Sequence, residues 1–264
     1  MLTSEDRRSN CSRRADQEKS LRDKIKHWVA LYKEIAELPR ISINLMLAGA
    51  ADNDPFFQKI TQQFHKSANS RHPKFPLIRR MEFGFAVCKL RDDERPYSAR
   101  LDSAARRNLK KAARLGYRFE RIDYNAHLAD VTRIHQSTTV RQGREMPADL
   151  ITKEAGPHSD PPSRNPRHDY PYFGIFKDEQ LVAYASCMVA GELCALQTIY
   201  GHADFLSDGV VPLLIASIGD DVPIQHPDVL YYAYDTYYGA SDTMKRFKRK
   251  FLFFPHRVTW LLGN

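Results

Sequence analysis

Acidic, phenolic and cationic side chains gather in one short stretch of the sequence, residues 231–254. Its pattern predicts an aromatic strand over residues 231–238, a helix over 241–250 and a second strand over 251–260. A strand-to-helix junction suits anion binding, because the first helical N–H groups lack backbone partners and the helix dipole adds positive charge. A solvated cationic helix beside a Tyr-rich core strand explains the same residues equally well. The groups with chemical capacity are Asp235, Tyr237, Tyr238, Lys245, Arg246, Lys248, Arg249 and Lys250.

The elements before this stretch predict a mixed sheet with helices on both faces. They are a strand at 82–90, a helix at 103–115, a strand at 117–122, a helix after Asn125, a three-stranded meander (172–176, 181–190, 193–200) and an apolar helix at 210–218. We assign residues 81–264 to this domain. Residues 21–80 are expected to form a helical N-terminal extension, with one helix ending at Pro39 and a second capped by Asp54. Residues 1–20 have too few apolar groups to bury, and disorder is expected there.

The composition limits the kinds of binding partner and the cellular location that are expected. A formal net charge of +8 over 264 residues favours a nucleic acid, a phosphorylated donor or an anionic surface, without choosing among them. The four cysteines, Cys11, Cys88, Cys187 and Cys194, have neither zinc-finger nor CxxC spacing, so free thiols and no metal site are expected. No apolar run approaches the ~18 residues of a membrane helix, and the N-terminus lacks a secretion signal. The expectation is a cytoplasmic protein with no membrane span.

From about Phe83 to Leu262 this order resembles the GNAT-like acyltransferases, in particular the divergent FemABX-like branch of aminoacyl-tRNA-dependent transferases. In that branch a Phe-Lys pair followed by an aromatic residue closes the catalytic domain, and Phe247-Lys248 with Phe251 stands in that place. The resemblance implies an α/β (α+β) fold and an N-acyltransferase that moves an acyl or aminoacyl group to an amine. The donor would be acyl-CoA or aminoacyl-tRNA, with no tightly bound cofactor.

The resemblance also suggests catalytic roles. Acyl transfer needs a neutral nucleophile, a stabilised oxyanion and a proton for the leaving group. Lys248 could stabilise the oxyanion or hold a phosphate, Asp235 could orient or deprotonate the amine, and Tyr237 or Tyr238 could protonate the leaving group. The alternatives are a turn cap for Asp235, a solvated cation for Lys248 and core packing for the tyrosines.

The donor is expected at the start of the apolar helix and along the basic helix. Ser207, Asp208, Gly209 and Val210 stand where GNAT-like proteins receive a pyrophosphate on helical N–H groups, and His202 opens the same loop. The loop has one glycine near the helix start, fewer than is usual for coenzyme A, whereas a basic helix suits tRNA phosphates. A solvated surface explains that helix too. Its cations are Arg106, Arg107, Lys110, Lys111 and Arg114.

The acceptor is expected beside the long Pro-rich loop at 144–171. Arg141, Arg144 and Tyr200 form the candidate acceptor set, and the arginines would suit an acceptor carboxylate. Cations at a helix C-terminus are favoured without any ligand, which is an equally good explanation. The alternative function for the whole chain is a non-catalytic RNA- or phosphate-binding protein on the same fold. The sequence leaves the oligomeric state open.

Overall fold

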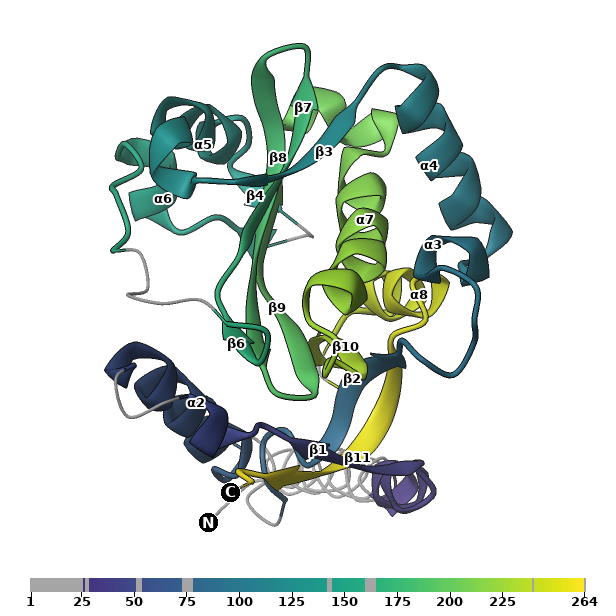
Figure 1. Cartoon of the computed structure of the whole chain (residues 1–264). Coiled ribbons are helices and arrows are strands. Elements are labelled where there is room, and N and C mark those ends of the chain that lie inside the picture. Colours follow the sequence, from purple (N-terminus) through teal and green to yellow (C-terminus); the bar gives the residue numbers. More distant parts are fainter. Residues whose placement is uncertain are drawn as a thin grey trace, which may run out of the picture. The chain divides into compact units, whose positions relative to one another are not determined.

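Figure 1 shows the computed structural model, which describes residues 26, 29–50, 54–72, 78–141, 144–159, 165–238 and 240–263, without the side chains of Phe83 and Arg144. The chain divides into two compact units, Met1–Pro39 and Arg40–Asn264. In the first unit, residues 29–36 are helical, in agreement with the helical spacing of the apolar residues there. The expected disorder of residues 1–20 lies outside the described residues.

In the described part of the second unit, nine strands form one mixed sheet. Its order is β1-β11-β2-β10-β9-β8-β7-β3, and β6 pairs with β8. β1 runs parallel to β11 and β9 runs parallel to β10, whereas the other neighbours are antiparallel. The strands are β1 (Arg40–Asn44), β2 (Phe83–Lys89), β3 (Arg118–Ile122), β6 (His168–Asp169), β7 (Tyr172–Lys177), β8 (Gln180–Ala190), β9 (Leu193–Gly201), β10 (Tyr231–Thr236) and β11 (Phe254–Leu261); β4 (Val140–Arg141) and β5 (Arg144–Glu145) form a separate ladder.

Helices lie on both faces of this sheet (Figure 1). α7 packs on β7, β8 and β9, with α3 and α4 against it, while α5 covers β8 and β9 on the opposite face. The expected mixed sheet flanked by helices is confirmed. The helices are α2 (Pro55–Ala68), α3 (Tyr97–Arg100), α4 (Ser103–Arg114), α5 (Leu128–Gln136), α6 (Ala148–Thr152), α7 (Val210–Gln225) and α8 (Asp242–Lys250), with 3-10 turns η1 (Leu47–Gly49), η2 (Tyr124–His127) and η3 (Ala203–Asp208).

The N-terminal part of the second unit differs from the expected helical extension. Arg40–Asn44 is a strand, β1, and it extends the sheet beyond β11. Ile41 and Ile43 are buried while their neighbours are not, which is the two-residue period of a strand. Five residues between two helical patterns give too weak a signal for that period to stand out. The structure divides after Pro39, and the boundary expected at residue 80 stays a prediction.

Local signals in the sequence start and end two helices where expected. The Asp54 carboxylate accepts a hydrogen bond from Phe57 N at 3.3 Å at the start of α2, and Asp102 accepts from Ala105 N at 2.7 Å at the start of α4. α4 ends before Gly116, whose φ of 81° is in the left-handed region that glycine adopts without strain. These caps set where α2 and α4 begin and where α4 ends.

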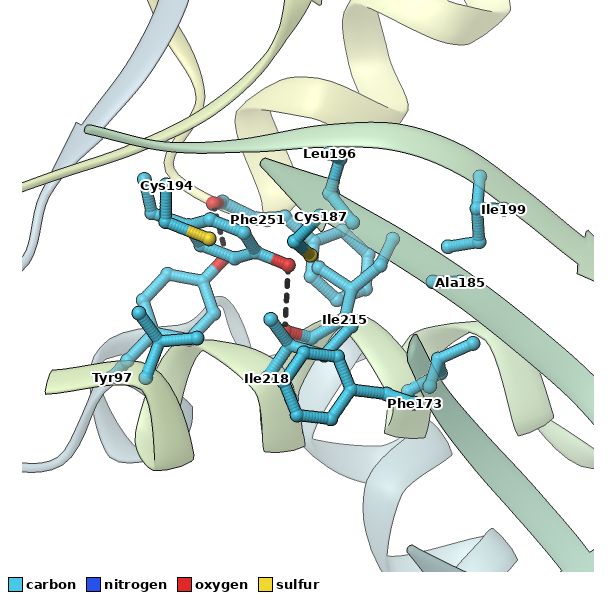
Figure 2. Close-up of a cluster of buried hydrophobic side chains, with 14 of the residues drawn as sticks. Tyr97, Phe173, Ala185, Cys187, Cys194, Leu196, Ile199, Ile215, Ile218 and Phe251 are labelled. Atoms are coloured by element: carbon cyan, nitrogen blue, oxygen red, sulfur yellow. Dashed lines mark hydrogen bonds between the residues drawn. The ribbon is translucent and has the colours of Figure 1, made fainter. Parts of the chain in front are cut away.

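The core between the sheet and α7 holds the strands in place (Figure 2). Tyr232 of β10 is fully buried there and donates to the Ile215 carbonyl at 3.3 Å, while Tyr97 donates to the Phe251 carbonyl at 2.6 Å. Burying an aromatic side chain of this kind stabilises a fold by roughly 2–3 kcal/mol. The paired hydroxyls remove the cost of an unbonded phenol. β10 and the turn after α8 are therefore anchored to α7 and α3.

Candidate active site

The most distinctive feature of the sheet is the point where β9 and β10 part. Their parallel register runs from Leu193↔Tyr231 to Ala195↔Ala233 and ends there. Further along, β9 stays paired with β8 and β10 stays near β2, so the two strands diverge in the middle of the sheet. Divergence of neighbouring strands opens space inside a sheet that is otherwise closed by hydrogen bonds.

Both strands carry a β-bulge immediately beyond the parting. On β9, Leu196 pairs with Cys187 and Thr198 pairs with Ser186, which makes Gln197 the extra residue. On β10, three residue steps from Ala233 to Thr236 match two on β2, and Asp235 has a φ of 50°. Bulges redirect side chains and are common beside active sites.

Gln197 and Asp235 are exposed, and both line one cavity of about 390 Å³. Phe64 and Ile60 of α2 form the opposite wall. The arrangement brings a carboxylate and a carboxamide to a recess with apolar sides. It can therefore orient an amine and a carbonyl group side by side.

Lys248 lies behind the β10 bulge rather than in solvent. Its side chain is 2% exposed, and Nζ donates to the carbonyl oxygens of Tyr234 and Thr236 at 2.6 and 2.7 Å. Those two carbonyls flank Asp235, so the ammonium group holds the backbone on both sides of the exposed carboxylate. Burial lowers the pKa of Lys248 to about 8, and the Asp235 charge opposes that shift. The position supports a role in shaping the site, while its predicted role in oxyanion stabilisation stays a prediction.

Neither of the two candidate tyrosines is among the residues that line the cavity. Tyr237 is buried, and its hydroxyl accepts a hydrogen bond from Arg249 Nε at 2.5 Å. Tyr238 packs on Gly84 so closely that a Cβ there would be 2.1 Å from the ring. Proton donation by Tyr237 or Tyr238 therefore stays a prediction.

The expected donor loop is occupied by contacts with α4. Lys111 Nζ donates to the Ser207 carbonyl at 2.9 Å and lies 3.1 Å from the Asp208 carboxylate. The Tyr117 hydroxyl also donates to Asp208, at 2.8 Å, and these two donors hold the pKa of Asp208 below its usual value. His202 caps η3, where its Nδ1 accepts from Asp204 N at 3.4 Å. Each of these polar groups already has a partner within the protein.

The N-terminus of α7 is covered by α4. A Cβ on Gly209 would lie 2.9 Å from the Asn108 carbonyl oxygen, and the glycine has a φ of 87° that disfavours other residues. Val210, the first residue of α7, is fully buried. The start of α7 therefore lies in close contact with α4.

Exposed cations stand on α4 and α8, two helices on the α7 side of the sheet (Figure 1), and we call these cations the basic surface. The C-terminal end of α8 meets the N-terminal end of α4, where Asp102 N donates to the Lys250 carbonyl at 3.5 Å. None of these cations makes an ion pair with another described residue, whereas Lys111 does. The members of this basic surface are Arg106, Arg107, Lys110, Arg114, Arg246 and Lys250.

The predicted acceptor residues lie on the opposite face, near β9. The Arg141 guanidinium stacks 4.2 Å above the Tyr200 ring and donates to the Ile199 carbonyl. Tyr200 stacks in turn on Tyr184 at 5.6 Å. The Arg144 side chain lies outside the described residues. Arg141 and Tyr200 thus pack on each other within the protein, and their role in acceptor binding stays a prediction.

Two groups of residues at these sites were missed from the sequence. Gln197 could not be recognised, because a bulge is defined by how β9 pairs with β8. The sequence alone does not give that pairing. A second cavity, of about 490 Å³, is lined by aromatic residues from five separate segments. The closely spaced Tyr170 and Tyr172 could have drawn notice, but their convergence with Tyr124 and Tyr184 depends on the fold.

No protein-family model and no curated protein sequence matches this chain. Among solved structures, it is similar to the C-terminal domain (DUF2156) of a protein described as a lysylphosphatidylglycerol synthetase from Agrobacterium fabrum, with 16% identity and a TM-score of 0.43 over 66% of this chain and 58% of that one. L-PGS from Bacillus licheniformis gives 11% identity and a TM-score of 0.40 over 66% and 60%. A tandem GNAT protein from the clavulanic acid biosynthesis pathway gives 13% and 0.41 over 67% and 53%.

The chain thus spans less than two thirds of the length of each of these three structures. The likenesses are weak, and the fold is established by the sheet order and the helix layers themselves. Among the described residues, no helix is long and apolar enough to cross a membrane. The same residues include no cluster of three or more His, Cys, Asp or Glu side chains placed to hold a metal ion.

Proposed function

We propose that the protein is an N-acyltransferase whose active site is the cavity at the parting of β9 and β10. The observation that carries the proposal is the pair of opposed bulges that bring Gln197 and Asp235 to one recess. A carboxylate at hydrogen-bond reach of an amine can orient it and accept the proton that it loses, and a carboxamide N–H can stabilise a developing oxyanion.

In the proposed reaction, the amine nitrogen of the acceptor attacks the carbonyl carbon of the donor. Asp235 takes the proton released as the new C–N bond forms, and Gln197 donates a hydrogen bond to the oxyanion. The carbon–oxygen bond to the donor then breaks, and the protonated carboxyl group returns its proton to the leaving oxygen. Lys248 acts through Asp235 as a positioning residue, because its Nζ holds the carbonyls on either side.

An aminoacyl-tRNA is the proposed donor, in line with the FemABX-like resemblance. This preference is supported by α4, whose Asn108 backbone lies against Gly209 at the helix start where a coenzyme A pyrophosphate would otherwise bind. It is also supported by the exposed cations of the basic surface, since tRNA affinity depends on neutralised phosphates. The amine acceptor stays open.

The reaction is tested with total tRNA charged with labelled amino acids, a panel of small primary amines, and labelled acetyl-CoA in a parallel series. We expect label transfer from tRNA that falls by about a hundredfold in Asp235→Asn, the size expected when a general base is lost. Lys153→Ala, which changes an exposed cation just after α6 that does not line the cavity, is the control. Transfer unaffected by Asp235→Asn would overturn the assignment of the site, and consumption of acetyl-CoA alone would overturn the donor.

One alternative function would use the same basic surface. A non-catalytic RNA-binding protein would also use the unpaired cations of α4 and α8. Binding of tRNA without transfer, and with equal affinity for charged and uncharged tRNA, would favour that alternative.

A further inference from the structure

The second cavity has walls built mainly of aromatic rings. It lies between α2 and the face of the sheet that carries Ser186 and Thr198, and its volume is about 490 Å³. No charged residue is among the described residues that line it. We call it the aromatic cage; its rings belong to Phe56, Tyr124, His158, Tyr170, Tyr172 and Tyr184.

Most neighbouring rings of the cage are tilted against one another, while His158 and Tyr172 stack at 18° with their centroids 6.1 Å apart. Tyr124 is the centre: its ring centroid lies 4.8 Å from Tyr172 at 42°, 4.6 Å from His158 at 34° and 5.8 Å from Tyr184 at 63°. On the other side, Tyr170 is 5.9 Å from Tyr172 at 57°. A flat ligand stacks best between parallel rings, whereas a compact rounded group can touch several tilted rings at once.

Hydrogen bonds of the lining residues hold the wall in place. The Tyr184 hydroxyl is bonded to His135 Nε2 at 2.6 Å, so that hydroxyl is already engaged. The segment that carries His158 is fixed by a reciprocal pair with Asn125, at 2.8 and 2.9 Å. A preformed wall lowers the entropy lost when a ligand binds.

The electrostatics of the cage select for a weakly hydrated cation. Burial raises the pKa of the Tyr124 and Tyr170 hydroxyls, which keeps both phenols neutral. The negative potential inside the cage therefore comes from ring faces and neutral oxygens. A primary ammonium ion is strongly hydrated and needs a carboxylate to replace its water, but an alkylated ammonium ion gives up little hydration.

We propose that the aromatic cage binds an alkylated ammonium group, quaternary or N-methylated, on a small-molecule ligand. The proposal goes beyond the acyl-transfer reaction and does not depend on it. Ile60 of α2 lines both the cage and the cavity at the parted strands, so a ligand held here would lie next to the proposed active site.

The test compares three alcohols by isothermal titration calorimetry on the full chain. Choline carries the cation, 3,3-dimethylbutan-1-ol is its neutral isostere, and ethanolamine has the same alcohol with an unmethylated ammonium. We expect choline to bind about tenfold more tightly than either, which corresponds to a cation–π contribution of the usual size. Equal affinities for choline and the neutral isostere, or no choline binding at millimolar concentrations, would overturn the proposal.

Variants locate the binding. Tyr172→Phe keeps the ring and should keep most of the choline affinity, whereas Tyr172→Leu should lower it by about tenfold. Tyr231→Leu, on β10 and outside the cage, is the control. Because Tyr172 is half-buried, thermal unfolding is measured for each variant, and His158→Leu on an exposed segment serves if Tyr172→Leu does not fold. If Tyr172→Leu and His158→Leu bind choline as tightly as the wild type, the choline site lies outside the cage and the assignment is refuted.

Discussion

The buried ammonium of Lys248 makes the stability of this protein depend on pH in an unusual direction. Replacement by methionine keeps an unbranched side chain of similar length but removes the titrating group. Burial lowers the pKa of Lys248 from 10.5 to about 8, so between these values the unfolded chain binds the proton more tightly than the folded one. Stability contributed by this group therefore rises as the pH rises through that window.

The size of the effect follows from the shift. Protonated Lys248 destabilises the folded state by roughly 3 kcal/mol at about pH 7, because each pKa unit corresponds to about 1.4 kcal/mol. At about pH 9.5 the folded-state amine is already neutral, and the remaining penalty is roughly 1.5 kcal/mol. The wild type should therefore gain about 2 kcal/mol over Lys248→Met between about pH 7 and about pH 9.5.

Hydrogen bonds also change the stability difference between wild type and Lys248→Met, but they do not change how that difference varies with pH. The two bonds from Nζ to the Tyr234 and Thr236 carbonyls are lost in Lys248→Met at every pH, at a cost of about 1–3 kcal/mol each. This loss shifts the stability of the variant downward by a constant amount. A neutral amine still has two N–H groups for those carbonyls, so the wild type keeps the bonds after deprotonation.

The assay is urea unfolding of both proteins at closely spaced pH values across this window. Taking the difference between them cancels the titration of the tyrosines and of the other lysines. Parallel stability curves for wild type and variant would refute the reasoning, since they would mean that Lys248 titrates alike in the folded and unfolded chain.

Two further predictions concern charged groups elsewhere. Arg106→Ala combined with Lys110→Ala should weaken tRNA binding and reduce the slope of log affinity against log salt by about two, with unchanged unfolding; an unaltered salt slope in filter binding would remove α4 from the binding surface. Asp169→Asn should destabilise the fold by about 3–5 kcal/mol, because the buried carboxylate accepts from Arg121 and lies 3.2 Å from His226 Nε2. Burial alone would raise the pKa of Asp169, but the bonds from His226 and Arg121 outweigh it and hold the pKa below its usual value. This contribution is lost on acidification, so wild type and Asp169→Asn should converge in urea stability at acid pH; a constant difference would contradict the ion-pair explanation.

The sequence predicts the central elements well where the signal is local. The meander, the Asp102 cap and the glycine after α4 depend on nearby residues, and they appear in the structure at the expected positions. β1 was not foreseen, since five residues become a strand only because β11 offers them a partner. Contacts between distant segments are set by tertiary packing, which single-sequence patterns do not encode.

At the candidate site, too, some residues could be identified from the sequence and others only from the structure. Asp235 and Lys248 could be selected from their types and from the family resemblance, and the structure brings both to the β10 bulge. That Lys248 faces backbone carbonyls instead of the cavity could not be read from its spacing, because five cations on one short helix look alike in sequence. Gln197 and Tyr124 enter the sites through a register shift and through side-chain convergence, respectively.

The position of β2 in the sheet has a consequence for how the chain is made. β2 lies between β10 and β11, both of which follow it by well over a hundred residues. Until those strands are synthesised, both edges of β2 lack their native partners, and pairing over such separations is slow. Nascent chains that end before β10 should therefore expose an apolar strand able to pair with other chains, which makes the late part of synthesis the stage most exposed to aggregation.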